Sequence, residues 1–262
     1  MDKTLRTAST GLSAQQRYVE IISNNLANVN TTGYKKVRPE FQDLLYETIK
    51  TAGNTQRTGS EPLNDIQIGS GTELVATTKQ FSQGDLSQTN NPLDFAISGE
   101  GFFMVRRPDN SIAYTRDGSF QLDRNGQLVT SQGYILEPGM IIPDDTREIT
   151  ISRDGVLTVK TDANIEEQIV GQIELARFLN PAGLNSLGDN LYQETGASGQ
   201  PIIEQAGVNN TGEIIQAHIE ASNVDLVQEM VNMIVAQRAY ELNSKSVKTA
   251  DEVLGIATNL KR

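Results

Sequence analysis

The sequence predicts an α+β fold, with a long helix at each end of the chain and a β-rich domain between them. Apolar residues recur every seven positions near both ends, which is the spacing of helices that pair as a coiled coil. The middle contains short β-prone stretches separated by Asp-Gly and Asn-Gly pairs, which favour tight hairpin turns. The predicted segments are an N-terminal helix in 1–34, an extended β arm or linker in 35–75, a β-rich outer domain in 76–210 and a C-terminal helical segment in 211–262.

The first helix is predicted from residues 1–29, which contain one glycine and no proline. Its expected apolar face has two lines of residues: Leu5, Leu12, Val19 and Leu26, and Ala8, Ile22 and Val29 with Gln15 as a polar member. The sequence NVNTTGY follows. Asparagine and glycine are common just after a helix C-terminus, so the helix is expected to end there.

The second helix is predicted to begin after Ser222 and Asp225, which resemble a variant of the capping box. Its expected apolar face has two lines of residues seven apart: Leu226, Met233, Tyr240, Val247 and Leu254, and Ala236, Asn243, Ala250 and Ala257. Several of these residues are small or polar. Two such helices bury only a thin apolar strip. The free energy gained by this burial barely offsets the conformational entropy lost on ordering the helices.

The helices are therefore expected to be completed by helices of other copies of the chain. The other interpretation is an ordinary coiled coil within one chain, or a core helix of a bundle. The seams lie at opposite ends of the chain and have amide-rich flanks, which favours contacts between copies. The candidate interface residues are Leu5, Leu12, Val19, Ile22, Asn25, Leu26, Asn28, Leu226, Met233, Tyr240, Val247 and Leu254.

A short repeat marks the β-rich middle. RDGSFQL begins at Arg116, RNGQLVT at Arg124 and RDGVLTV at Arg153. Each repeat places a turn dipeptide before a β-prone segment, so each predicts a hairpin. The residues expected to supply the core are Phe102, Phe103, Val105, Phe120, Leu122, Leu128, Val129, Tyr134 and Ile135.

Composition excludes several classes of function. The net charge of −11 disfavours binding to nucleic acid and docking on anionic lipid, because both need a surplus of Lys and Arg. The chain has no cysteine and one histidine, His218, which excludes disulfides, zinc–thiolate sites and multi-histidine metal sites. No apolar run approaches the roughly 20 residues that cross a bilayer, and the N-terminus lacks the features of a cleaved signal. No cofactor is expected.

Enzymatic activity is not expected either. Asp94, Glu100, Asp117 and Asp123 could supply the carboxylate pair of a glycosidase. However, Asp117 belongs to a DG turn and Asp123 lies just before an NG turn, so turn formation accounts for both. The segment from Asp123 also fails the calcium-loop pattern, because Gly126 and Tyr134 stand at the wrong positions.

Longer motifs resemble the flagellar rod, hook and hook-associated family. ISNNLANVNTTGYKK at 22–36 is similar to the N-terminal signature of that family, and SNVDLVQEMVNMIVAQRAYEL from Ser222 is similar to its closing helix. GDLSQTNNPLDFAISGEGFF at 84–103 and YTRDGSFQLDRNGQLVTSQGY at 114–134 resemble its central motif. DLLYETIKTAGNTQRTGSEPLNDIQIGSGT resembles the arm of distal-rod members.

This resemblance implies a structural subunit of the distal rod that self-assembles into a hollow helical shaft and transmits torque from motor to hook. The implied partners are copies of the chain itself, proximal rod proteins, the hook protein, the rod cap and the surrounding ring bushing, without nucleic acid or membrane insertion. The implied location is the flagellar basal body, spanning the periplasm, after type III export without a cleaved signal. The alternatives are a proximal rod or hook subunit and, in a different class, a secreted glycan-active β domain.

Overall fold

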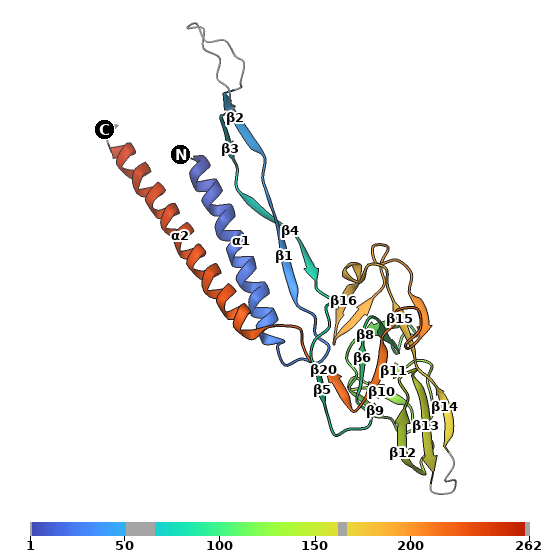
Figure 1. The fold of residues 1–262 in the computed structure, drawn as a ribbon. Helices are drawn as coiled ribbons and strands as arrows, with labels where there is room; N and C mark the ends of the chain where they lie inside the picture. The colour runs from blue at the N-terminus through green and yellow to red at the C-terminus, as the bar shows by residue number, and fades with distance from the viewer. Residues whose placement is uncertain (1, 51–65, 162–166, 260–262) are drawn as a thin grey trace. The chain divides into compact units, whose positions relative to one another are not determined.

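The computed structural model describes residues 2–50, 66–161 and 167–259 (Figure 1). These residues form an α+β fold that divides into two compact units. Unit 1 draws on residues 1–27, 37–78 and 225–262, and unit 2 on residues 28–36 and 79–224. The predicted segments differ from these units mainly at 28–36 and 211–224, which belong to unit 2.

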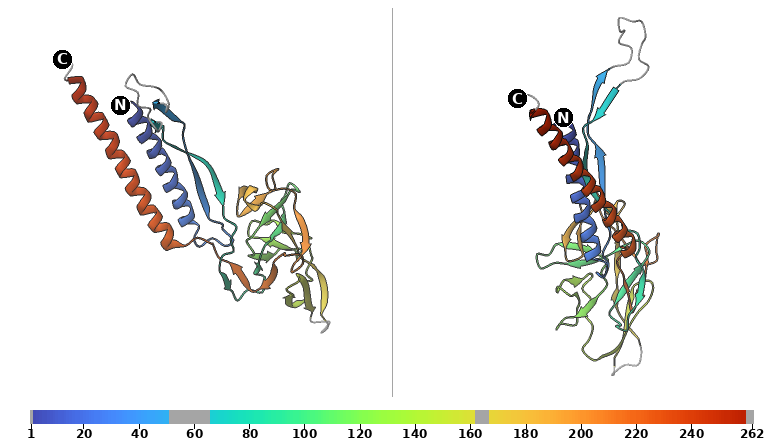
Figure 2. Two further views of the ribbon diagram at one scale, coloured as in Figure 1. Left: turned by 45° about the horizontal axis from the view of Figure 1, so that its top comes forward. Right: turned by 90° about the vertical axis from the view of Figure 1, so that its left-hand side faces the viewer.

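Unit 1 contains the two predicted helices. Helix α1 spans Asp2–Ala27 and helix α2 spans Leu226–Asn259, and the two run antiparallel (Figures 1 and 2). Helix α2 begins where the Asp225 carboxylate accepts the amide N–H of Gln228 at 3.1 Å, which is an N-cap bond. The predicted cap at Ser222 is wrong, because the helix begins only at Leu226 and Asp225 caps it. The Ser222 hydroxyl accepts the amide N–H of Val224, which precedes the helix.

Among its described residues, unit 1 also has four strands: β1 Val37–Asp43, β2 Tyr46–Lys50, β3 Ile66–Gly69 and β4 Thr72–Lys79. The last residue of β4, Lys79, is the first residue of the 79–224 part of unit 2. β1 pairs with β4, and β2 pairs antiparallel with β3. Helix α1 lies between α2 and the β1–β4 pair (Figures 1 and 2). The rings of Tyr18 on α1 and Phe41 on β1 are 6.1 Å apart, edge to face. One side of α1 is therefore occupied by strands.

Unit 2 is the β-rich body. Its strands are β5 Leu86–Gln88, β6 Phe95–Ser98, β7 Phe102–Arg106, β8 Ile112–Thr115, β9 Phe120–Leu122, β10 Leu128–Thr130, β11 Ile135–Leu136, β12 Thr146–Ile151, β13 Val156–Thr161, β14 Gln168–Gln172, β15 Glu174–Arg177, β16 Asn185–Gly188, β17 Leu191–Gln193, β18 Ile202–Gln205, β19 Glu213–Gln216 and β20 His218–Glu220. A short 3₁₀ helix, η1, spans Pro181–Gly183.

The largest sheet among the described residues follows the order β16-β17-β8-β7-β11-β10-β9, with β15 beside β7 and β18 beside β15. β12, β13 and β14 form a second sheet. β19 pairs with β6 and β20 pairs with β5, both antiparallel. Residues 213–220 are therefore mostly strands of the body, although the predicted C-terminal helical segment included them; helix α2 begins only at Leu226.

Most of the predicted core is confirmed. Five of the expected residues are buried: Phe102, Phe103, Val105, Phe120 and Leu128. Val129, Tyr134 and Ile135 are half-buried. Leu122 is 42% exposed, contrary to expectation. It is the last residue of the three-residue edge strand β9, so little of the body extends far enough to cover it.

Two of the three sequence repeats form hairpins. β9 pairs with β10 across Gly126, and β12 pairs with β13 across Gly155. The first repeat does not form a hairpin, because β8 and β9 are not paired. A Cβ at Gly118 would lie 1.5 Å from the carbonyl oxygen of Phe95. Glycine is required there by a close approach of two backbones rather than by a hairpin turn.

Tyr114 provides a test of core burial. Burial, assisted by the nearby Glu194 carboxylate, raises the pKa of Tyr114 to about 12. Between the unfolded pKa near 10 and this value the folded state holds more protons than the unfolded chain, so stability is full below pH 10 and falls as pH rises. From pH 9 to pH 11, we expect the unfolding free energy of the wild type to fall by about 1 kcal/mol more than that of Tyr114→Phe, because the variant has no hydroxyl to ionise at this position. Urea unfolding at both pH values measures this difference.

The control for this experiment is Tyr240→Phe, which removes the same hydroxyl from a tyrosine that is 43% exposed on α2. Equal loss of stability in Tyr114→Phe and the wild type would show that Tyr114 ionises equally in the folded and unfolded states.

Candidate functional site

The predicted interface residues of α1 mostly face the interior of unit 1. Ile22 and Asn25 are each only 1% exposed. Leu5, Leu12, Val19 and Leu26 are half-buried, as is Asn28 just beyond the helix. The outward face of α1 is polar: Lys3, Arg6, Ser13, Arg17 and Ser23 are exposed. Helix α1 therefore contributes little apolar surface for contacts beyond its own chain.

The predicted residues of α2 divide between two faces. Ala236 is 1% exposed, and Asn243 contacts Gly11 of α1. Met233 and Val247 are half-buried, whereas Leu226 is exposed like Tyr240. The side chain of Leu254 lies outside the described residues. The face of α2 toward α1 thus follows the line of small and polar residues rather than the line of large apolar ones.

A second apolar face of α2 was not predicted. It consists of Val227, Met230, Val231, Ile234 and Val235, which are between 48% and 68% exposed. We call these five residues the α2 outer strip. Its members recur at spacings of three and four, which places them on one face of a helix. The residues 226–237 contain one charged side chain, Glu229, and it is buried.

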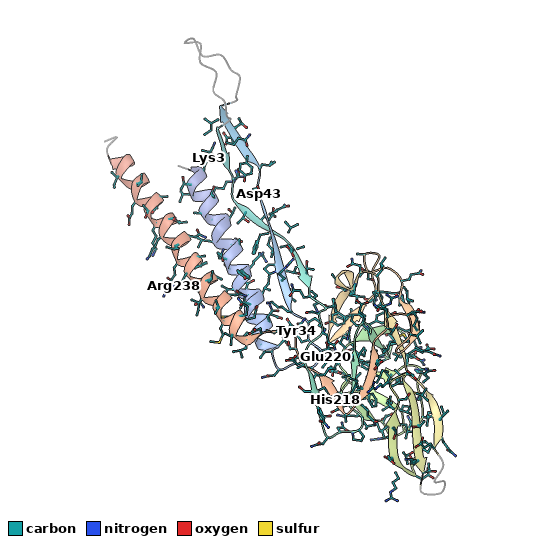
Figure 3. All side chains as sticks on the ribbon, in the orientation of Figure 1. Lys3, Tyr34, Asp43, His218, Glu220 and Arg238 are labelled. Atoms are coloured by element: carbon teal, nitrogen blue, oxygen red, sulfur yellow. The ribbon has the colours of Figure 1, made fainter. Side chains whose placement is uncertain are left out.

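The outer strip ends where charged residues begin. Arg238, labelled in Figure 3, projects from the side of α2 that faces away from α1 and pairs with Glu241. Beyond it, Lys245, Lys248 and Glu252 are exposed. Large apolar side chains are also exposed there, at Leu242, Val253 and Ile256, so the outer face of α2 changes from apolar in its first three turns to mixed apolar and charged in later turns.

The strands of unit 1 carry a further exposed apolar set. Leu45 is 88% exposed, and Tyr46, Ile49 and Ile68 on β2 and β3 are about half exposed. Soluble monomers rarely group such side chains in water without a binding role. This set is a second candidate contact surface of unit 1.

Asn25 links three parts of unit 1. Its side-chain amide donates to the carbonyl oxygen of Val37 at 2.9 Å and to the Glu229 carboxylate at 3.2 Å. Its side-chain oxygen accepts the amide N–H of Val37 at 3.0 Å. The Asn25 side chain thus joins the end of α1 to the start of β1 and the first turn of α2. In this structure its contacts lie within one chain, so a role between copies stays a prediction.

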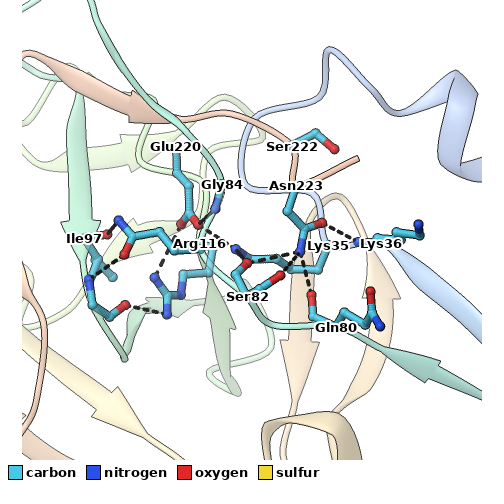
Figure 4. A network of polar contacts seen from close by, with 12 residues as sticks. Lys35, Lys36, Gln80, Ser82, Gly84, Ile97, Arg116, Glu220, Ser222 and Asn223 are labelled. Atoms are coloured by element: carbon cyan, nitrogen blue, oxygen red, sulfur yellow. Dashed lines mark hydrogen bonds and ion pairs between the residues drawn. The ribbon is translucent and has the colours of Figure 1, made fainter. Parts of the chain in front are cut away.

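Unit 2 contains a buried charged cluster that was missed from the sequence. Lys35 and Glu220 are fully buried and form an ion pair at 2.5 Å (Figure 4). The buried Arg116 approaches the same carboxylate at 3.4 Å and donates to the carbonyl oxygen of Gly99 at 2.9 Å. The amide N–H of Gly84 also donates to Glu220, at 2.9 Å. One carboxylate therefore collects donors from several separate segments.

This cluster holds two cations and one carboxylate. Burial lowers the pKa of Lys35, opposed by the charge of Glu220. Burial likewise lowers the pKa of Arg116, again opposed by Glu220. The excess cation is met by carbonyl oxygens, since Lys35 also donates to Ser82 O at 2.8 Å. Removing Glu220 would leave two buried cations without a counter-ion, which is strongly destabilising.

Asn223 extends the cluster. Its side-chain oxygen accepts the amide N–H of Lys36 at 2.7 Å. Its side-chain amide donates to the carbonyl oxygens of Gln80 at 2.8 Å and Ser82 at 3.1 Å (Figure 4). In addition, the main-chain oxygen of Glu220 accepts the amide N–H of Gly33 at 2.8 Å. We call Lys35, Arg116, Glu220 and Asn223 the joint, because together they tie residues 33–36, 80–84 and 220–223.

The carboxylates weighed as catalytic residues are engaged in turns. Asp94 accepts the hydroxyl of Thr89 at 2.7 Å and the amide of Asn91 at 2.9 Å. Asp117 accepts the hydroxyl of Thr32 at 3.0 Å, and Asp123 accepts the amide of Asn125 at 3.2 Å. Glu100 is exposed, and its main-chain oxygen accepts the amide N–H of Gly212. No cluster of potential metal ligands occurs within the described ranges.

His218 is half-buried on β20, and its Nδ1 lies 2.8 Å from the carbonyl oxygen of Gln216. In the part of the chain that the structure describes, neither helix has the length and apolar character that a membrane span requires.

Comparison with protein families gives three matches. The model described as "Flagella basal body rod protein" matches residues 5–35, and "Flagellar hook protein FlgE/F/G D1 domain" matches residues 96–159. "Flagellar basal body rod FlgEFG protein C-terminal" matches residues 215–260. The matched regions include α1, much of the body and α2.

Full-length relatives agree with these matches. The chain is 49% identical to the flagellar basal-body rod protein FlgG of Borreliella burgdorferi, over 100% of both chains. It is 45% identical to the FlgG of Caulobacter vibrioides over 99% of both chains, and 39% identical to that of Bacillus subtilis over 100% of both. The similarity therefore extends through both units.

Proposed function

The chain belongs to the family of flagellar basal-body rod proteins, and on that premise we propose that it assembles with copies of itself into the distal rod. It is a structural protein of the basal body and not an enzyme. In the proposed polymer the helices form a hollow inner tube, with the β-rich body outside. The rod then transmits torque from motor to hook.

The observation that carries this proposal is the α2 outer strip. Its five apolar side chains are between 48% and 68% exposed in a single chain. Burying them against a neighbouring subunit would contribute on the order of 5 kcal/mol per contact. A polymer offers every subunit such a neighbour, whereas a single chain leaves the strip in water.

Further features support finer parts of the proposal. A coiled-coil-like pairing of α1 and α2 is supported by the contact of Gly11 with Asn243 and by the hydrogen bond between Asn25 and Glu229. A role of residues 35–75 as an extended arm that touches neighbouring subunits is supported by the exposed side chains around Leu45. Residues 51–65 of that arm lie outside the described residues.

The remaining partners follow from the proposed place in the flagellum. A distal rod subunit would contact proximal rod proteins, the hook protein, the rod cap and the ring bushing. It would span the periplasm, which it would reach by type III export without a cleaved signal. The acidic net charge of −11 supports a surface that does not adhere to nucleic acid or to anionic lipid.

Electron microscopy of the purified full chain at increasing concentration tests the proposal. We expect straight hollow filaments to appear above a critical concentration, because each added subunit buries an outer strip. Sedimentation of the same samples should show loss of the single-chain species above that concentration. A chain that stays single at the highest concentration reached would contradict self-assembly.

A further inference from the structure

The joint lies close, along the chain, to every connection between the two units. Four covalent connections link the two units, at 27/28, 36/37, 78/79 and 224/225. The segments that the joint ties are 33–36, 80–84 and 220–223. Each connection therefore leaves unit 2 within a few residues of a segment that the joint holds.

The bonds of the joint cross between these segments rather than along them. Lys35 of the first segment meets Glu220 of the third and Ser82 of the second. Asn223 of the third segment binds Lys36 and Gln80, the residues nearest the 36/37 and 78/79 connections. The carbonyl oxygen of Lys36 also accepts the amide N–H of Gln80 at 2.9 Å. The three segments are thereby tied to one another inside unit 2 (Figure 4).

Close backbone packing reinforces the joint. A Cβ at Gly84 would lie 2.0 Å from the carbonyl oxygen of Ala221, and one at Gly33 would lie 2.7 Å from the backbone of Arg116. A larger residue at either position would push the segments apart. Glycine therefore permits the approach on which the polar contacts depend.

We propose that the joint, centred on Glu220 and Asn223, is the positioning device through which torque passes along the chain between the assembling helices and the β body. This rests on the proposed function. Force that enters unit 2 through any of the four connections reaches a segment tied to the other two segments. The joint shares that force among them, so no single connection bends alone, and the assembled rod is stiff.

The ion pair is suited to this role. A buried pair fixes geometry through charge-assisted bonds, which are short and directional. Glu220 is fully buried, so water does not compete for its oxygens.

The test is the bending stiffness of polymers made from variant full-length chains. Lys35→Met removes one cation and leaves Arg116 paired with Glu220, so it avoids an unpaired buried carboxylate. Asn223→Ala removes the neutral half of the joint. We expect the double variant to form rods whose persistence length, measured on electron micrographs, is less than half that of wild-type rods.

The control is Ser198→Ala. Ser198 is buried in unit 2, where its bonds run to Thr195 and Gly199 rather than to the joint. Rods of this control should keep the wild-type persistence length. If rods of the double variant had wild-type stiffness, the proposed role of the joint would be contradicted. Failure of the folded double variant to assemble while the control assembles would also contradict the proposal, because the joint is proposed to stiffen rods and not to form them.

The single variants Lys35→Met and Asn223→Ala test the charged and the neutral half of the joint separately. Each should give rods whose persistence length lies between those of the wild type and the double variant. If the wild type itself forms no rods, the proposed function fails, and that result is distinguishable from failure of the joint. If wild-type rods form and the single variants and the double variant all match their stiffness, the joint alone fails.

Discussion

Ile234→Asp should abolish rod formation while leaving the single chain folded. Ile234 is 56% exposed on α2, so a carboxylate there is solvated in the single chain and should change the unfolding free energy by less than about 0.5 kcal/mol. In the polymer the same carboxylate would be buried without a partner, which costs several kcal/mol. We expect the critical concentration to rise at least about 100-fold, which corresponds to about 2.7 kcal/mol. Sedimentation over a concentration series measures it.

The matched control is Ile169→Asp on β14. Ile169 is 73% exposed and belongs to unit 2, so the same chemical change is made at a comparably exposed isoleucine of the β body. This variant should assemble as the wild type does. Normal rods from Ile234→Asp would show that the outer strip is not covered by a neighbouring subunit.

Asn25→Ala should produce the largest loss of stability in unit 1. The change removes two hydrogen bonds to the Val37 backbone and one to Glu229. Because Asn25 and Glu229 are each 1% exposed, water does not readily replace these bonds, and buried groups lose partners. We expect a loss of about 3 kcal/mol, measured by urea unfolding with the far-ultraviolet circular dichroism of the helices as the signal.

Ser23→Ala is the control for Asn25→Ala. Ser23 lies two residues earlier on α1 and is exposed, so its replacement should change the unfolding free energy by less than about 0.5 kcal/mol. Equal stability of the two variants would contradict this prediction, because it would show that water replaces the hydrogen bonds of Asn25 at no cost in unfolding free energy.

The architecture of the chain was largely predictable, because strong local signals specify it. Seven-residue spacing identified both helices, although helix α2 begins at Leu226, well after the predicted boundary at 211. An extended β arm or linker was predicted in 35–75, and β1, β2, β3 and the first half of β4 lie there. β1 and β2 gave no comparable signal, since Pro39 and several charged residues interrupt any alternation of apolar side chains.

The faces of the helices were harder to predict. Heptad spacing identifies the residues that share a line but not the partner that covers them. Helix α1 packs against strands as well as against α2, which buries Ala14 outside the predicted lines. On α2, Ala236 and Asn243 approach α1, so the longer apolar side chains of the outer strip remain exposed.

The joint could not be found from local patterns. Lys35 and Glu220 are 185 positions apart, and single charged residues normally read as solvated surface. Only the pairing of β20 with β5 brings Glu220 beside the segment that contains Ser82 and Gly84. Asn223 was visible only as one letter of a longer motif, because its role depends on three backbone groups from distant segments.

Assembly through the α2 outer strip is tested by an electron cryomicroscopy reconstruction of rods assembled from the wild-type chain, at a resolution that shows side chains. We expect Val227, Met230, Val231, Ile234 and Val235 to be covered by a neighbouring subunit. Rods in which these five side chains still face water would contradict it.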